Sequence, residues 1–314
     1  MKRFVLVTLF DSNYLAKGLV NYYSLQKYLK NFVLYAYCFD ELSYEAISKL
    51  NLKNLVAIRF SDFEDKMLLK IKGNKDRLYE YYWACVPFVI EKTLQRKEAE
   101  YVTYMDADLM FFSNPSTLFD FSKDVDVLIQ PNNFSYNETH QFDPVGYYCS
   151  GWVTFRDNPG GRRVLEWWNR QCLKWCSARF KDGKFGDQKY LDDWRFRFNR
   201  VQEIAEVGSS IAPWNVNKYD ISNKGGRIFI NNKWPLIYYH YHSFRMNLLD
   251  YKYIIEGDRN NNYTISNEVK GLIYESYINN MKKVIKDLKN IKGYCEYVKL
   301  NPRGNYHINK SKIK

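Results

Sequence analysis

The chain is poor in the residues that usually hold zinc or build a disulfide framework. It has six cysteines and four histidines in 314 residues. Cys172 and Cys176 lie one helical turn apart, but no histidine or further cysteine pair accompanies them, which argues against a zinc site. We interpret the cysteines as free thiols in a reducing cytosol.

Long apolar runs are also missing. The apolar stretch Phe4–Phe10 ends at Asp11 and has no small-residue cleavage site, so it does not resemble an export signal. No run approaches the roughly 20 apolar residues that a bilayer-spanning helix needs. The sequence therefore predicts a cytoplasmic protein whose first strand is Phe4–Phe10.

The glycine-rich loops of common phosphate-binding sites are absent. Neither G-x-G-x-x-G nor G-x-x-x-x-G-K-[ST] occurs, so neither dinucleotide nor P-loop binding is supported. G-x-S-x-G and H-E-x-x-H are absent as well. If this protein binds phosphates, we expect a metal ion to compensate most of their charge.

Acidic residues are scarce near the C-terminus. Residues 277–314 hold ten Lys or Arg and two acids, a charge of +8, so residues 1–276 carry only +4 of the total of +12. The apolar positions of this region follow helical spacing, with lysines on the other face: Ile273, Tyr277, Met281, Val284, Leu288 and Ile291. A basic helix favours an anionic surface such as phospholipid head groups or nucleic acid, and a simple solvated helix face explains it equally well.

What is present is ample core material and a regular alternation of elements. Hydrophobic residues make up 46% of the chain and aromatic residues 18%, which excludes a disordered protein. Alternating strand and helix patterns predict an α/β fold with a mostly parallel sheet flanked by helices. The strands are expected at 4–10, 32–39, 55–60, 101–105, 125–130, 152–155 and 236–242, and the helices at 15–29, 44–50, 77–94, 162–180 and 186–194, with Pro87 kinking or dividing its helix.

Two aspartates follow one of these strands directly. Asp106 and Asp108 come after Tyr101–Met105, and because side chains alternate along an extended chain, the two carboxylates point the same way. Placing two like charges side by side in a buried position costs free energy unless a positive charge lies between them. The pair therefore indicates a divalent cation, with surface carboxylates at the start of a loop as the alternative.

Three further segments offer polar side chains. His240 and His242 alternate on an expected strand, where imidazoles could bind metal or simply pack. Asp187 and Gln188 begin an expected helix, where Asp187 could contact a sugar or act only as an N-cap. The turn after the first strand, residues 11–14, could bind a base and ribose, or its side chains could cap the following helix.

Taken together, these segments resemble the nucleotide-diphospho-sugar transferases of the GT-A fold, and most closely a bacterial group similar to glycosyltransferase family 8. The order and spacing of the motifs agree over roughly residues 4–245. The matching segments are Leu9-Phe10-Asp11-Ser12-Asn13-Tyr14, Tyr104-Met105-Asp106-Ala107-Asp108, Cys149-Ser150-Gly151-Trp152-Val153, Gly186-Asp187-Gln188 and His240-Tyr241-His242-Ser243. Cys149 and Ser243 depart from the asparagine and glycine that the family has at these places.

The resemblance implies a function and a set of site residues. A sugar would be transferred from a nucleotide diphosphate donor, most readily a UDP-sugar, to an acceptor hydroxyl with retention of configuration. Mn²⁺ or Mg²⁺ would be held by Asp106, Asp108 and His240, with His242 as the other candidate histidine. Asp187 and Gln188 would be the catalytic pair, and the donor would contact Thr8, Leu9, Phe10, Asp11, Asn13, Tyr14, Asp106, Ala107 and Asp108.

The resemblance also implies partners. The acceptor would be a glycan or lipid-linked glycan in lipopolysaccharide, O-antigen or capsule synthesis, reached at the inner membrane through the basic C-terminal region, and no nucleic acid is expected. Residues 1–248 would form the catalytic domain and residues 249–314 a basic, mainly helical extension. Two other functions stay open: a sugar-phosphate nucleotidyltransferase, and a non-catalytic protein that binds glycan or nucleic acid.

Overall fold

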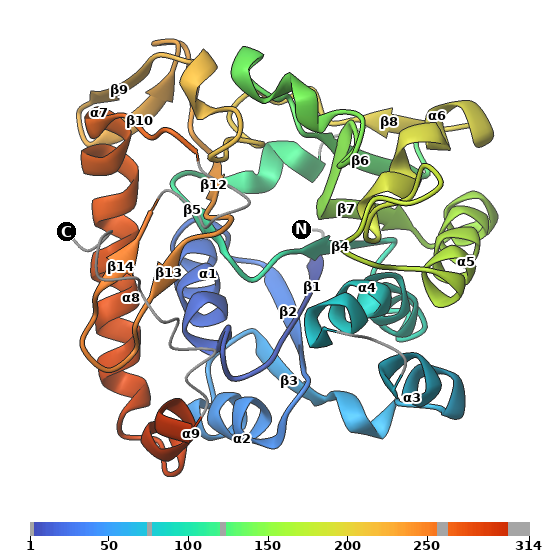
Figure 1. The fold of residues 1–314 in the computed structure, drawn as a ribbon, viewed down its shortest axis with the longest axis horizontal. Helices are drawn as coiled ribbons and strands as arrows, with labels where there is room; N and C mark the ends of the chain where they lie inside the picture. The colour runs from blue at the N-terminus through green and yellow to red at the C-terminus, as the bar shows by residue number, and fades with distance from the viewer. Residues whose placement is uncertain (1–2, 74–76, 120–123, 256–262, 301–314) are drawn as a thin grey trace. The chain divides into compact units, whose positions relative to one another are not determined.

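The computed structural model describes residues 3–73, 77–119, 124–255 and 263–300 and divides the chain into two compact units (Figure 1). Unit 1 takes the chain up to Phe10, Lys30–Asp106 and Ser116–Glu206, and unit 2 takes Asp11–Leu29, Ala107–Pro115 and the chain from Val207 onward. Each unit is thus built from segments far apart in the sequence. The predicted division at residue 248 stays a prediction, and the compact units divide the chain at other places.

Unit 1 is built on one seven-stranded sheet with the order β3-β2-β1-β4-β7-β6-β8. All neighbouring pairs are parallel except those that β7 makes with β4 and β6. The α/β prediction with a mostly parallel sheet is therefore confirmed. The strands are β1 Phe4–Phe10, β2 Phe32–Cys38, β3 Leu55–Arg59, β4 Tyr101–Met105, β6 Val127–Pro131, β7 Tyr148–Arg156 and β8 Val201–Glu203.

The central strands of this sheet are apolar and covered on both faces. Every residue of β2 is buried, as expected for a central strand between helices. Helices α4 (Leu78–Leu94) and α5 (Pro159–Lys174) pack against each other and against the sheet (Figure 1). Trp168 of α5 stacks on Phe155 of β7 and meets Trp194 edge to face, so large aromatic rings fill this part of the core. Helices α2 (Glu41–Leu50), α3 (Lys66–Gly73) and α6 (Trp194–Arg197) complete the helices described in unit 1.

Unit 2 combines a small sheet with helices from both ends of the chain. In it, β5 (Leu109–Phe111) pairs antiparallel with β12 (Tyr238–His240), and α1 (Leu15–Tyr28) packs against both β5 and α8 (Glu275–Leu288). The other elements are β9 Ile221–Lys224, β10 Arg227–Ile230, β11 Trp234–Pro235, β13 Arg245–Met246, β14 Tyr253–Ile254, α7 Asn267–Val269 and α9 Tyr294–Leu300.

The amphipathic C-terminal helix is confirmed, and its apolar face is occupied by the protein itself. Tyr277, Met281 and Val284 of α8 are buried inside unit 2, while Lys282 and Lys286 on the other face are exposed. An interfacial helix needs its apolar face for the lipid. In this helix only the charge of the lysine face remains for an anionic surface. No helix among the described residues is long and apolar enough to cross a membrane. Residues 301–314 of the predicted basic tail lie outside the described part.

Some expected boundaries differ from the structure. Helix α4 runs undivided through Pro87, so this proline does not divide its helix, and the alternative prediction of a kink stays a prediction. The strand predicted to reach His242 ends at His240, because Tyr241 donates its backbone N–H to Asp108 and then accepts the turn hydrogen bond of Phe244. The helix expected after Gly186 is a 3₁₀ helix, Gln188–Asp193, followed by α6. A further 3₁₀ helix, Tyr136–Gln141, lies between β6 and β7.

Replacement of Gly208 tests the close backbone packing beside β12. The carbonyl of Gly208 accepts the N–H of Ile237 at 2.8 Å, and a Cβ at Gly208 would lie 2.0 Å from the carbonyl oxygen of Pro235. We expect Gly208→Ala to lower the free energy of unfolding by about 2–4 kcal/mol, because the obstacle is backbone and cannot turn away. Urea unfolding of the full chain measures this effect.

The matched control for this test is Gly271→Ala. A Cβ at Gly271 meets nothing within 4 Å and the position is helical, so the change should be neutral or slightly stabilising. Equal unfolding midpoints for the two variants would contradict the prediction.

Candidate functional site

Asp108 and His240 are brought together by the small sheet of unit 2. Leu109 of β5 is paired with His240 of β12, and the backbone of Tyr241 donates to the carbonyl of Asp108 at 2.9 Å. This register places Nε2 of His240 3.2 Å from Oδ1 of Asp108. Both side chains are buried. The pairing of two distant strands therefore makes the contact.

Lys17 of α1 approaches the other oxygen of the same carboxylate. Its Nζ lies 3.6 Å from Oδ2 of Asp108, and the side chains of both residues are about nine-tenths buried. Burial alone would oppose the ionisation of Asp108, but the charges of His240 and Lys17 outweigh it and hold the pKa of Asp108 well below its usual range. Asp108 is therefore ionised at neutral pH and flanked on both of its oxygens.

Asp106 lies in unit 1 and has surroundings of its own. Its backbone N–H donates to the carbonyl of Gly151 at 3.0 Å, which ties the end of β4 to β7. The hydroxyl of Tyr104 donates to Oδ1 of Asp106 at 2.8 Å. Ala107, the residue between the two aspartates, is buried. Asp106 is thus held by backbone and side chain, two residues before Asp108 in the chain.

These residues fit a divalent cation by their chemistry. Asp106, Asp108 and His240 supply two carboxylates and an imidazole, which is a common donor set for Mn²⁺ and similar ions. Two ligands at right angles on one ion, each at about 2.1 Å, lie about 3 Å apart. The 3.2 Å between Nε2 of His240 and Oδ1 of Asp108 agrees with that spacing. Lys17 contacts Oδ2 of Asp108, so Oδ1 is the oxygen that would bind the cation.

Asp187 is a buried acid of unit 1 whose pKa is raised. It is buried, and burial together with the negative charge of Asp106 raises the pKa of Asp187 to about 7, although a hydrogen bond from Ser150 opposes the shift. Among the described residues, Oδ2 of Asp187 finds no hydrogen-bond partner. The side chain does not cap the following 3₁₀ helix, so the N-cap interpretation is wrong. A buried acid with one unsatisfied oxygen is a candidate contact for a ligand hydroxyl.

Gln188 and the loop before β7 are linked. Nε2 of Gln188 donates to the carbonyl of Val145 at 3.1 Å, which fixes the direction of the side-chain amide. The next residue, Lys189, donates from Nζ to the carbonyl of Phe142 at 3.0 Å. The segment before β7 is therefore fastened to the predicted catalytic pair.

The turn after β1 is organised by Asp11. Its two carboxylate oxygens accept from the backbone N–H and the side-chain amide of Asn13, each at 3.0 Å. The ring of Tyr14 is partly exposed, and Nζ of Lys17 lies 4.1 Å from its centroid. The structure thus makes Asp11 the organiser of the turn, and its predicted contact with a nucleotide stays a prediction.

The other predicted donor contacts are buried. Thr8, Leu9 and Phe10 belong to β1, and their side chains are covered. A nucleotide would have to meet these three residues through their backbone, so that part of the prediction also stays untested.

His242 lies just beyond β12 and is less buried than His240. Trp214 meets both imidazoles edge to face, with centroid distances of 5.2 Å to His240 and 5.6 Å to His242. The ring of Trp214 thus supports both candidate ligands, and His240 contacts Asp108 at 3.2 Å.

The sequence did not reveal Lys17, Trp214 or Tyr277 as site residues. Lys17 lies three residues after Tyr14 in an otherwise apolar helix start, which is the one signal that could have indicated it. Trp214 and Tyr277 lie far along the chain. Tyr277 stacks on Tyr241 with 3.6 Å between ring centroids. Tyr241 lies between His240 and His242 in the sequence.

The chain is similar to known proteins. One protein family, described as nucleotide-diphospho-sugar transferase, matches residues 93–278. The uncharacterized protein YfnF of Bacillus subtilis (strain 168) is 32% identical over 246 residues, which cover 76% of this chain and 81% of YfnF.

Solved glycosyltransferases share the fold. Apo GlyE of Streptococcus pneumoniae TIGR4 has a TM-score of 0.54 at 11% identity, covering 94% of this chain and 64% of GlyE. An active-site mutant of LgtC has a TM-score of 0.50 at 14% identity, covering 85% of this chain and 99% of that one. At such identities the likeness is one of fold.

The raised pKa of Asp187 predicts a pH-dependent stability. The folded protein holds this proton more tightly than the unfolded chain does, so Asp187 lowers the free energy of unfolding as pH rises from about 4 to about 7. We expect Asp187→Asn to gain stability over the wild type across that window, on the order of 4 kcal/mol at most, with no further change at higher pH. Urea unfolding of the metal-free protein at pH 4.5 and pH 8 measures it.

Asp182→Asn serves as the control for this measurement. Asp182 lies on an exposed turn of the same unit, so its replacement should shift stability equally at both pH values. A pH-independent difference between Asp187→Asn and the wild type would contradict the assignment of the raised pKa.

The two histidines can be separated by metal affinity. Because His240 contacts Asp108 and is more buried than His242, we expect His240→Gln to weaken Mn²⁺ binding by about 10–100-fold and His242→Gln to weaken it only a few-fold. Calorimetric titration with Mn²⁺ measures both. The reverse order of the two effects would assign the metal to His242.

Proposed function

The chain belongs to the family of nucleotide-diphospho-sugar transferases and is a glycosyltransferase, and from this premise we propose that it moves a sugar from a UDP-sugar to an acceptor hydroxyl with the help of a divalent cation. The observation that carries the proposal is the ionised Asp108 held against His240 in the segment that begins with Asp106. Carboxylate and imidazole ligands of this kind suit an ion that faces phosphate oxygens.

In the proposed site, Asp106, Asp108 and His240 hold Mn²⁺ or Mg²⁺. When bound, the ion would supply Lewis-acid stabilisation of the negative charge that the diphosphate gains as it leaves. Lys17 keeps Asp108 ionised and oriented through the opposite oxygen. The hydroxyl hydrogen bond from Tyr104 orients Asp106. The ligand side chains are thus preorganised by the protein, which lowers the cost of binding the donor.

Asp187 and Gln188 are proposed to meet the sugar. Oδ2 of Asp187 is available to accept a hydrogen bond from a sugar hydroxyl, and Trp168 fixes the backbone there by donating Nε1–H to the carbonyl of Asp187 at 2.8 Å. The amide of Gln188 is oriented through Val145. Such fixed polar groups can stabilise positive charge at the reacting carbon. Retention of configuration is part of the proposal by resemblance.

The nucleotide is proposed to lie against the turn after β1. The partly exposed ring of Tyr14 can stack on a base, and the side chain of Asn13 is held in place by Asp11. We propose a glycan or lipid-linked glycan as acceptor, in surface-glycan synthesis. Contact with an anionic membrane would involve the exposed lysines of α8 without its buried apolar face.

A donor titration tests the proposal. We expect nucleotide sugars to bind the wild type only with Mn²⁺ present, and Asp108→Asn to reduce both this binding and slow donor hydrolysis at least about 100-fold, because a charged ligand is lost. Calorimetry and detection of the released nucleoside diphosphate measure the two effects. Asp182→Asn, on its exposed turn, should behave as the wild type.

Other outcomes identify the rival functions. Nucleotide-sugar binding that is independent of metal and unaffected by Asp108→Asn would favour a non-catalytic binding protein. Release of pyrophosphate from a nucleoside triphosphate and a sugar phosphate would favour a nucleotidyltransferase.

A further inference from the structure

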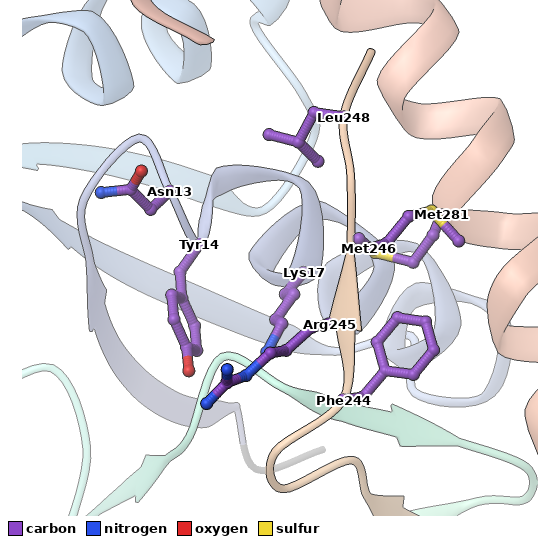
Figure 2. Close-up of a pocket in the computed structure, with 8 residues that line it drawn as sticks. All are labelled: Asn13, Tyr14, Lys17, Phe244, Arg245, Met246, Leu248 and Met281. Carbon is purple, nitrogen blue, oxygen red and sulfur yellow. The ribbon is translucent and has the colours of Figure 1, made fainter. Parts of the chain in front are cut away.

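Unit 2 contains a pocket whose two sides differ in chemistry (Figure 2). Asn13, Tyr14, Lys17 and Arg245 line its polar side, with Arg245 and Lys17 reaching toward the side of Tyr14 in the view. We propose that Lys17 and Arg245 form a clamp for the donor's phosphates, supplied by the protein beside the metal ligands. This inference rests on the proposed transferase function and adds two residues to it.

Lys17 already connects the pocket to the candidate metal ligands. Its ammonium lies 3.6 Å from Asp108 and 4.1 Å from the centroid of the Tyr14 ring. One cation therefore borders both the carboxylate that would bind the ion and the ring proposed to bind the base. In a nucleotide diphosphate, the phosphates occupy the stretch between base and metal. Lys17 is at the place where their negative charge would pass.

Arg245 reaches the same pocket from a different part of the chain. It belongs to β13, where its backbone is paired with Ile254 of β14, and its residue is only half-buried. The short hairpin thus sets the backbone while the guanidinium extends into the pocket (Figure 2). Arginine presents several N–H donors in a planar fork that matches phosphate oxygens two at a time, which a lysine cannot do.

The charge balance of the occupied site favours two protein cations. Two aspartates would neutralise a divalent ion, so the two charges on the phosphates of a nucleotide sugar would remain uncompensated. Lys17 and Arg245 carry one positive charge each and would balance them. Uncompensated charge in a largely buried site is costly, so this balance has a physical reason.

A second observation comes from Tyr277 of α8, the helix that packs against α1. Its hydroxyl is fully buried and has no hydrogen-bond partner among the described residues. A buried phenol without a partner is uncommon in a folded protein, and a ligand oxygen would satisfy it.

The opposite side of the pocket is apolar and comes from Phe244, Met246 and Met281 (Figure 2). This wall offers no anionic group, so nothing there competes with a phosphate for the two cations.

The test compares variants of the full chain by calorimetric titration with uridine, guanosine, cytidine and thymidine diphosphates in the presence of Mn²⁺. We expect Arg245→Met to weaken binding of the accepted diphosphate about 10–100-fold, and Arg245→Lys to weaken it less, because charge is kept while the fork is lost. Binding of the matching nucleoside and of Mn²⁺ alone should not change. Lys17→Met should also weaken diphosphate binding. Because Lys17 is buried, circular dichroism is used to check that this variant is folded.

The control is Arg227→Met, an exposed arginine of β10 in the same unit that does not line the pocket. It should bind as the wild type does. Diphosphate affinity of Arg245→Met within about two-fold of the wild type would overturn the clamp, and so would an equal loss for the nucleoside. In both cases the transferase function stands. If the wild type binds none of the four diphosphates and none of the nucleotide sugars, the proposed function fails and the clamp fails with it.

Discussion

The candidate site of unit 2 depends on one buried carboxylate with a cationic or imidazole partner at each of its oxygens. Asp108 is contacted by His240 at Oδ1 and by Lys17 at Oδ2. A single buried carboxylate would be costly, and these two partners keep it ionised. Each partner comes from a different element, so β5, β12 and α1 must all be in place for the charge to be tolerated. The contacts that fold unit 2 are therefore the same contacts that keep the candidate metal ligand ionised.

The C-terminal helix is part of this arrangement. Tyr277 of α8 stacks on Tyr241, the residue after the histidine ligand, at 3.6 Å and an interplanar angle of 8°. Tyr274 adds a second contact to Tyr241. These rings fix the segment that carries His240 by burial and aromatic packing. The apolar stripe of α8 is used to build the site, which explains why it is not offered to a membrane.

Much of the fold could be predicted from local patterns. β1 and β4 have the bounds that their apolar runs indicated, because a strand buried on both faces needs continuous apolar sequence. The ends of elements near the site were less predictable. Whether the strand stops at His240 or at His242 depends on the hydrogen bond from Tyr241 to Asp108, and that bond joins residues more than a hundred positions apart.

The sequence by itself determined the chemistry of the parts: an acidic pair after a strand, two histidines at alternate positions, and an Asp-Gln pair after a glycine. Periodicity and residue type carry that information, because both act over a few residues. Only the tertiary structure decided which groups meet. It placed Lys17 on Asp108, left Oδ2 of Asp187 without a partner, and brought Arg245 into the pocket beside Tyr14. Contacts between distant segments depend on packing of the whole unit, which no local pattern encodes.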